Sequence, residues 1–233
     1  IFVGFASNSW AAQGDVSEYQ INLKKVELCT SKYCTDTFVV STDQKAIDLS
    51  QASAGAAAGN MAITTKPKVG KIYTHVGLTM SRTFQVTGVS SESDCVTTIS
   101  GSIGAFASGD DGVNTAGGAA SSTAGASSIS MFIHSSAAYG SNLGLEANWG
   151  NLTNAAALTW VGGSETTAAD VRVVYALTAS YTVSNQPPEI TVTIDTQNTI
   201  FDGSGGNNCG DGAVDADQAV LFITDPIVNL TIK

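Results

Sequence analysis

The segment 170-DVRVVYALTASYTV-183 decides the fold class, because apolar residues occupy every second position along it. The apolar series consists of Val171, Val173, Tyr175, Leu177, Ala179, Tyr181 and Val183. The positions between them include Arg172, Thr178, Ser180 and Thr182. A period of two is the signature of a strand with one buried face. We therefore expect a half-buried strand here, followed after the break at Pro187-Pro188 by a second strand around Val192.

Shorter segments with the same pattern follow one another along the rest of the chain. Between Tyr19 and Leu28 the apolar positions alternate but slip by one residue at Lys24-Lys25, which is what a β-bulge produces. Further strand candidates are Thr37–Val40, Ile72–Met80, Thr83–Val86, Val96–Ile99, Ser128–His134, Leu158–Val161, Ala219–Thr224 and Ile227–Ile232. Many short strands separated by turn residues predict an all-β protein, either a sandwich or a barrel.

Two segments depart from this strand pattern. The stretch Gln44–Ala58 is the only helix candidate, and Gly55 weakens it, so we expect one short helical turn or none. The stretch Gly101–Ser127 is rich in Gly, Ala and Ser and predicts a long insertion loop, ordered by packing against another surface. We therefore divide the chain into an N-terminal strand and tether over 1–17 and one sandwich domain over 18–233.

Composition excludes several classes of partner. The 233 residues are 43% hydrophobic and 13% charged, against about 25% charged in an ordinary soluble domain. The formal net charge of −10 argues against binding to nucleic acid or an anionic membrane, which both require a basic face. No apolar stretch reaches the roughly 18 residues that a membrane-spanning helix needs, so we expect no transmembrane segment.

Four cysteines favour two disulfides and an oxidising compartment, extracellular or at the cell surface. Cys29 and Cys34 flank Thr30-Ser31-Lys32-Tyr33, a spacing that suits a bridge at a hairpin tip and leaves Cys95 and Cys209 for each other. Two other connectivities stay open. A zinc site is less favoured, because the tight C-x₂-C ligand pair is absent.

Other features also agree with export. The sequence starts at Ile1 without Met, as it would after removal of a signal peptide, although a trimmed chain would start in the same way. Asn151-Leu152-Thr153 and Asn229-Leu230-Thr231 fit the acceptor pattern for N-glycosylation, which also arises by chance.

One acidic segment, Asn207–Gln218, resembles the calcium loop of EF-hand and dockerin modules. Its candidate ligands are Asn207, Asp211, Asp215 and Asp217. Cys209 stands at the third position, where the pattern has an oxygen ligand, and Gln218 stands at the twelfth, where it requires a bidentate acid. Two interpretations stay open, a degraded calcium site and a solvated acidic turn held by Cys209, and the missing ligands favour the second. We expect no other cofactor.

The residues that would mark an enzyme do not form a recognisable pattern. There is no G-x-S-x-G motif, and the two histidines, His75 and His134, both lie in strand candidates. The spacing of Glu146, Glu165 and Glu189 does not single out a pair of catalytic carboxylates. We therefore expect a protein that is not an enzyme.

The first residues, Ile1-Phe2-Val3-Gly4-Phe5, are almost wholly apolar and precede a polar tether, Ala6–Ser17. Such a segment needs shelter, since an exposed apolar strand invites edge-to-edge association. Three placements are open: an edge strand of its own domain, the remnant of a signal peptide, or a strand added to the sheet of a neighbouring copy. We favour the third narrowly.

Strand addition has a consistent energetic basis. Ile1, Val3 and Phe5 would face one side of the acceptor sheet and Phe2 the other, while Gly4 permits close backbone approach. Burying four large side chains is worth roughly 6–12 kcal/mol per junction. Because donor and acceptor surfaces differ, the contact is heterologous and propagates into a filament unless a ring closes.

Two blocks of sequence carry a family resemblance. The block 19-YQINLKKVELC-29, followed by Cys34, and the block 70-GKIYTHVGLTMSRTF-84 resemble exported bacterial all-β surface proteins. Together with the apolar first residues, the plan is similar to that of pilus and biofilm-fibre subunits that polymerise by donor-strand complementation. The resemblance implies a single β-sandwich of the jelly-roll or immunoglobulin-like type, a cleaved signal peptide and a homopolymeric extracellular fibre. The alternative is a monomeric carbohydrate-binding or adhesin module, with Trp10, Trp149 and Trp160 as stacking platforms for surface glycans.

Overall fold

The fold is all-β, as the strand pattern predicts. The computed structural model describes residues 13–51, 67–89, 96–98, 103–104, 118–120, 126–132, 155–164, 167–185, 190–197, 199–202, 221–223 and 227–232. The strands are β1 Gln13–Gly14, β2 Val16–Cys29, β3 Thr37–Ser41, β4 Lys45–Asp48, β5 Ile72–Ser81, β6 Thr83–Gly88, β7 Val96–Thr98, β8 Ile103–Gly104, β9 Gly118–Ala120, β10 Ile129–Phe132, β11 Ala155–Val161, β12 Asp170–Thr182, β13 Ile190–Asp195, β14 Ile200–Asp202, β15 Leu221–Ile223 and β16 Ile227–Ile232. One 3₁₀ turn, η1 over Leu49–Gln51, confirms the short helical turn expected within Gln44–Ala58.

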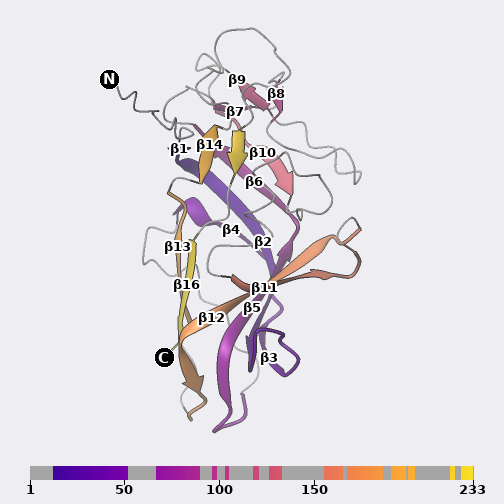
Figure 1. The fold of residues 1–233 in the computed structure, drawn as a ribbon, viewed down its shortest axis with the longest axis vertical. Helices are drawn as coiled ribbons and strands as arrows, with labels where there is room; N and C mark the ends of the chain where they lie inside the picture. The colour runs from indigo at the N-terminus through magenta and orange to yellow at the C-terminus, as the bar shows by residue number, and fades with distance from the viewer. Residues whose placement is uncertain are drawn as a thin grey trace, which may run out of the picture.

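An eight-stranded antiparallel sheet forms the centre of the molecule (Figure 1). Strands β5 and β6 follow each other along one edge of β2, and β3 and β4 follow each other along its other edge. Beyond β5 and β6 lie β12 and β10, and β11 pairs with β12. The register against β5 shifts between Leu23 and Lys25, which confirms the bulge predicted at Lys24-Lys25.

The deciding segment forms β12, and all but one of its predicted inward positions are buried. The exception is Ala179, which is exposed. Ala179 lies in the stretch between Ala176 and Tyr181 where the register between β12 and β5 shifts. The prediction that Ala179 is buried with the other apolar positions was wrong. Beyond the shift, Tyr181 and Val183 are buried again.

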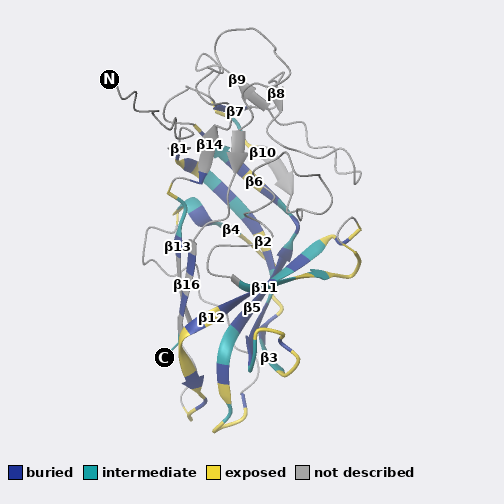
Figure 2. Ribbon diagram, viewed as in Figure 1, coloured by how far each residue is buried: buried dark blue, intermediate teal, exposed yellow. Residues whose placement is uncertain are grey.

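One face of the sheet carries the apolar core (Figure 2). Its fully buried members include Tyr19, Leu28, Val76 and Val171, and Tyr19 stacks on Phe84 with ring centroids 5.3 Å apart. The hairpin-like pair β13–β16 packs against β12 and adds three side chains to this core: Ile194, Val228 and Leu230. Strands β13 and β16 therefore cover part of the core beside β12, while the assignment to a jelly-roll or immunoglobulin-like sandwich stays a prediction.

Smaller sheets complete the described structure. Strands β1, β14 and β15 form one, and β7, β9 and β8 form another. Because β8 and β9 lie within Gly101–Ser127, the predicted insertion loop contains strands that the sequence pattern did not indicate. Residues 13–14 and 16–17, within the range assigned to the tether, form β1 and the first part of β2.

Candidate functional site

A disulfide closes the hairpin between β2 and β3, on the face of the sheet opposite the apolar core. Cys29 and Cys34 are bonded with a Cα–Cα distance of 4.8 Å, which confirms the predicted pairing. The turn is also held by backbone hydrogen bonds from Thr30 N to Asp36 O and from Cys34 N to Ser31 O, both 3.1 Å. Cys34 adopts a positive φ of 48°, and both cysteines are buried. The bridge therefore fixes the register of β2 and β3 where their pairing begins.

Gly77 lets the disulfide lie close against the sheet. A Cβ atom at this position of β5 would meet the sulfur atoms of Cys29 and Cys34 at 3.4 Å each, closer than most real contacts. Val174 on the neighbouring strand β12 is buried against the two cysteines, and Ala157 on β11 packs beside them. The disulfide is thus the centre of a small second apolar cluster on this face.

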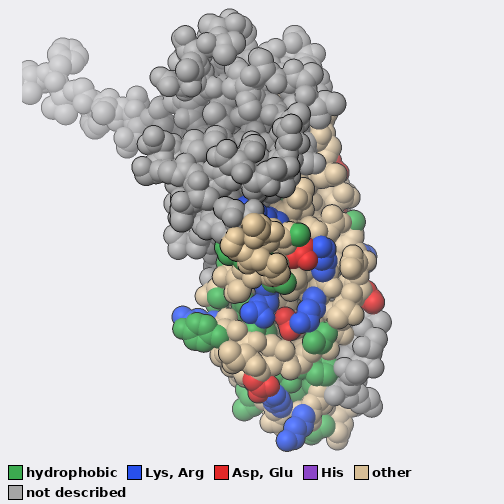
Figure 3. All heavy atoms as spheres, turned by 90° about the vertical axis from the view of Figure 1, so that its right-hand side faces the viewer, with side chains coloured by type: hydrophobic (Ala, Val, Ile, Leu, Met, Phe, Trp, Pro, Cys, Tyr) green, Lys and Arg blue, Asp and Glu red, His purple; other side chains and the backbone are tan. Residues whose placement is uncertain are grey.

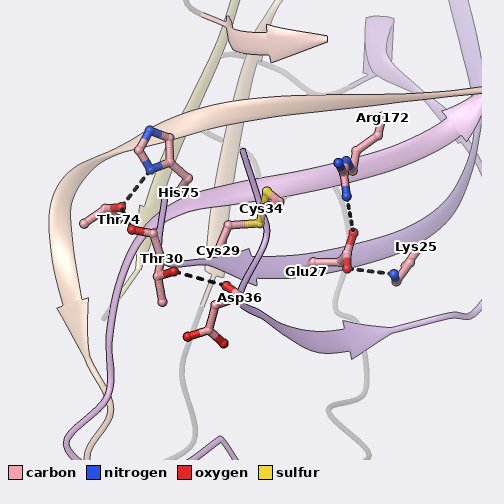
Figure 4. The surroundings of a disulfide bond; sticks show 9 residues. All are labelled: Lys25, Glu27, Cys29, Thr30, Cys34, Asp36, Thr74, His75 and Arg172. Carbon is pink, nitrogen blue, oxygen red and sulfur yellow. Dashed lines mark hydrogen bonds and ion pairs between the residues drawn. A yellow bond between two sulfur atoms is a disulfide. The ribbon is translucent and has the colours of Figure 1, made fainter. Parts of the chain in front are cut away.

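A buried carboxylate lies beside this cluster (Figure 4). Glu27 lies on the polar face of β2, opposite Gly77 of β5. It is nevertheless only 2% exposed. Its Oε1 is 2.7 Å from Lys25 Nζ, and its Oε2 is 3.9 Å from Arg172 Nη1. Register explains the grouping, because Lys25 and Arg172 both lie opposite Thr79 of β5, on either side of it.

The ion pairing of this cluster is incomplete. Glu27 Oε2 and Arg172 Nε are buried and make no hydrogen bond within the described structure. Burying an ionised group costs several kcal/mol, so the attraction to Lys25 and Arg172 has to offset the desolvation of Glu27. Through these contacts the cluster connects β2 to β12 across β5.

His75 lies next to the disulfide, opposite Cys29 in the β2–β5 ladder. Its Nδ1 is 2.7 Å from the hydroxyl oxygen of Thr74, and that hydroxyl donates to the backbone carbonyl of Thr30 at 2.9 Å. The single proton of the hydroxyl is therefore engaged, so Nδ1–H must be the donor to Thr74. His75 cannot then act as the base that activates Thr74. Burial lowers the pKa of His75, and the nearby cation of Lys32 lowers it further.

A metal site, a membrane-spanning helix and a basic surface each require a particular arrangement of the described residues. No group of three or more His, Cys, Asp or Glu side chains is arranged there to hold a metal ion. In the same ranges, no helix has the length and apolar character needed to cross a membrane. On the described part of the side shown in Figure 3, acidic and basic side chains lie near one another, and no extended basic patch is visible.

Most of the other predicted site residues lie outside the described ranges and stay predictions. They are the donor strand Ile1, Phe2, Val3, Gly4 and Phe5, the second cysteine pair Cys95 and Cys209, the calcium candidates Asn207, Asp211, Asp215 and Asp217, and the acceptor Asn151. Asn229 lies within β16, opposite Thr193 of β13, and not in the surface loop that an acceptor motif usually indicates. Trp160 is half-buried against the core, with the Arg82 guanidinium 5.2 Å from its ring centroid, so it is a poor stacking platform.

The two sides of the eight-stranded sheet end differently. On one side β11 pairs only with β12 among the described residues, and its sequence AAALTWV carries no charge. Leu158 and Trp160 of β11 face the core but remain partly exposed. On the other side the β3–β4 edge carries Lys45 and the exposed Asp43, and it is interrupted between the two strands. The β11 edge lacks the charged residues that usually protect an edge strand against further pairing.

Sequence reasoning missed both the buried ion cluster and the β11 edge. A signal for the cluster exists, since Glu27 is flanked by Val26, Leu28 and Cys29 in a strand that is otherwise apolar at this end. Arg172 is likewise the one charged residue at the alternate positions between Val171 and Val183, the most regular apolar series of the chain. Their association depends on the pairing of β2, β5 and β12, which no local pattern specifies.

Known proteins offer no guide to this site. The chain matches no protein-family model, no curated protein and no solved structure. Function must therefore be argued from the chain itself, from the open β11 edge and from the apolar segment at Ile1–Phe5.

Proposed function

We propose that the chain is the structural subunit of an extracellular filament, which assembles head-to-tail when Ile1–Phe5 of one copy adds as a strand to the sheet of the next. The observation that carries the proposal is the open edge of the eight-stranded sheet, beside which large apolar side chains remain partly exposed. An apolar segment and an uncharged sheet edge that no other described strand pairs with are the two complementary parts that strand addition requires.

The energetics favour a stable junction. The apolar side chains of Ile1–Phe5 are worth roughly 6–12 kcal/mol when buried, and backbone hydrogen bonds to the acceptor strand set the orientation. The Cys29–Cys34 disulfide suits assembly outside the cell, since such bonds persist in oxidising compartments. In this proposal the fold serves as a scaffold, and the ion cluster of Glu27 stabilises it without taking part in chemistry.

The test compares two triple variants of the full chain by negative-stain microscopy and analytical ultracentrifugation. Replacement of Ile1, Val3 and Phe5 by Ser removes the apolar donor face, and should weaken each junction by about 5–9 kcal/mol. We expect folded subunits that no longer form filaments.

A matched control places the same number of serines in the tether, at Ala6, Ala11 and Ala12. This control should form filaments like the unaltered chain. Filaments that persist after the change at Ile1, Val3 and Phe5 would disprove strand donation. An unaltered chain that stays monomeric at all concentrations would disprove the filament itself.

A second candidate function, glycan binding, rests on Tyr33. This residue stands at the tip of the disulfide hairpin with 67% of its surface exposed, and Lys32 Nζ lies 5.1 Å from its ring centroid. An exposed aromatic ring next to a cation is a suitable surface for stacking a sugar. A glycan array should then show a signal that the Tyr33→Ala variant loses and the Tyr33→Phe variant keeps. Equal signals from all three proteins would rule out this role.

A further inference from the structure

We infer that β11 is the acceptor strand, so that Ile1–Phe5 of a neighbouring copy pairs with the outer edge of Ala155–Val161. The inference rests on the proposed function and adds to it the place where the donor binds. In Figure 1, β11 is the last strand of the eight-stranded sheet beyond β12, and within the described residues nothing pairs with its other side.

Charge distinguishes β11 from the β3–β4 edge. A donor strand without charged side chains would meet no charge along AAALTWV. At the β3–β4 edge it would lie along Lys45 and near Asp43, and desolvating these groups would oppose binding. That edge is also divided at residues 42–44 into the five residues of β3 and the four of β4, whereas β11 is continuous over seven.

Length distinguishes β11 from β10. Strand β10 also ends the sheet path, at the side of β6, but it contains four residues, whereas β11 contains seven. A five-residue donor can pair along its whole length with β11 but not with β10. Backbone hydrogen bonds supply much of the affinity of strand addition, so the longer edge is favoured.

Burial shows which face of the donor would meet the core. Leu158 and Trp160 of β11 extend the apolar core but are only partly covered, while Thr159 between them is exposed on the opposite face. A donor strand next to β11 would place Ile1, Val3 and Phe5 beside Leu158 and Trp160. Phe2 would then lie on the same face as Thr159, because side chains alternate along a strand.

A pair of edge variants tests the acceptor in the full chain. Thr159 and Val161 are both exposed, so their replacement by Lys charges the β11 edge without disturbing the core. We expect the Thr159→Lys/Val161→Lys variant to fold, as judged by circular dichroism, and to raise the critical concentration for filament formation at least about tenfold. The matched control, Thr42→Lys/Gln44→Lys, places two lysines at exposed positions of the opposite edge and should assemble normally.

Disulfide trapping tests the pairing directly. A Phe2→Cys/Thr159→Cys chain, oxidised after assembly, should give a ladder of covalent multimers on a non-reducing denaturing gel. A Phe2→Cys/Thr42→Cys chain should not. A ladder confined to the Thr42→Cys chain, or a cross-link within single chains only, would overturn the assignment of β11.

The filament function and the assignment of β11 as acceptor are contradicted by different results. If the unaltered chain forms no filaments, or forms them without Ile1, Val3 and Phe5, the proposed function is wrong. If filaments require these residues but the Thr159→Lys/Val161→Lys variant assembles normally and Thr159→Cys is not trapped, the donor stands and the acceptor lies elsewhere.

Discussion

The two faces of the central sheet bury their side chains in different ways. Leu28 and Glu27 are neighbours in β2 and are 0% and 2% exposed, respectively. Leu28 belongs to the continuous apolar core with Val76 of the adjacent strand. Glu27 is buried on the opposite face, with Lys25 and Arg172 as its charged neighbours and the disulfide cluster nearby (Figure 4). The same backbone therefore carries a face held by apolar packing and a face held by a disulfide and charge.

This difference indicates which substitutions each face of the sheet can tolerate without a large loss of stability. Apolar packing loses the transfer free energy of the removed atoms and a further amount for the cavity that remains, so the cost of a substitution depends on how far its site can collapse. A charge cluster responds asymmetrically, because removing one partner leaves a buried charge, whereas removing all partners can be nearly neutral. The predictions that follow use this asymmetry to separate the two faces.

The largest effect is expected on the apolar face. Replacement of Leu28 by Ala should lower the free energy of unfolding by about 3–4 kcal/mol, because the site is fully buried and the cavity cannot collapse completely. Denaturant unfolding followed by circular dichroism measures the change. Thr178→Ala, at an exposed position of β12, should change stability by less than about 0.5 kcal/mol. A cost below about 1 kcal/mol for Leu28→Ala would mean that this face is not a tightly packed core.

A smaller loss is expected when Glu27 is left without its cations. The Lys25→Met/Arg172→Met variant should lose about 2–3 kcal/mol, since a nearly buried carboxylate would lack its neighbouring cations. Adding Glu27→Gln to this variant removes the charge and should restore more than half of that loss. The restoration distinguishes charge from packing, because the third substitution hardly changes side-chain volume. If Glu27→Gln lowers stability further, the cluster is held by geometry and not by compensation of charge.

Removal of the disulfide should lower the free energy of unfolding by less than Leu28→Ala does. The Cys29→Ala/Cys34→Ala variant is expected to lose about 2 kcal/mol, since a bridge between residues only five apart removes little entropy from the unfolded chain. Thermal unfolding of the variant and of the unaltered chain, each with and without a reducing agent, measures the effect. A loss as large as that of Leu28→Ala would show that the hairpin organises the whole polar face and not only its own turn.

The strands and the hairpin bridge could be predicted because their signals are local. Alternation of apolar residues placed β12, and the one-residue slip at Lys24-Lys25 placed the bulge of β2. The spacing of Cys29 and Cys34 likewise predicted a bridge that the structure confirms. Each of these features depends on residues within a few positions of one another.

The features that the sequence did not predict depend on contacts between segments that are distant in the chain. Ala179 is exposed in the stretch where the register against β5 shifts, and no property of β12 alone reports that shift. The burial of Glu27 depends on Arg172, which reaches it across β5. The open edge at β11 is likewise a property of strand order, since the same apolar sequence inside a sheet would be an ordinary central strand. Period-two patterns predict strands but not their neighbours.

The smallest expected effect concerns His75, which lies at the border of the disulfide cluster. Its pKa is lowered in the folded protein, first by burial and then by the cation of Lys32, relative to about 6.5 in an unfolded chain. The unfolded state therefore binds more protons as the pH falls through about 6.5, and stability must decrease over that range. Above about pH 7.5 the residue is neutral in both states and contributes no pH dependence.

Unfolding measured between pH 7.5 and 5.5 should thus show a decline in stability that the His75→Gln variant lacks. Lys32→Gln should reduce the decline without abolishing it, because burial is the larger cause and persists when the cation is removed. A full loss of the decline in His75→Gln and a partial loss in Lys32→Gln would assign the pH dependence to the polar face. Leu28→Ala, on the apolar face, should lower stability equally at both pH values. If His75→Gln leaves the decline unchanged, the titration originates elsewhere, and the polar face is insensitive to pH in this range.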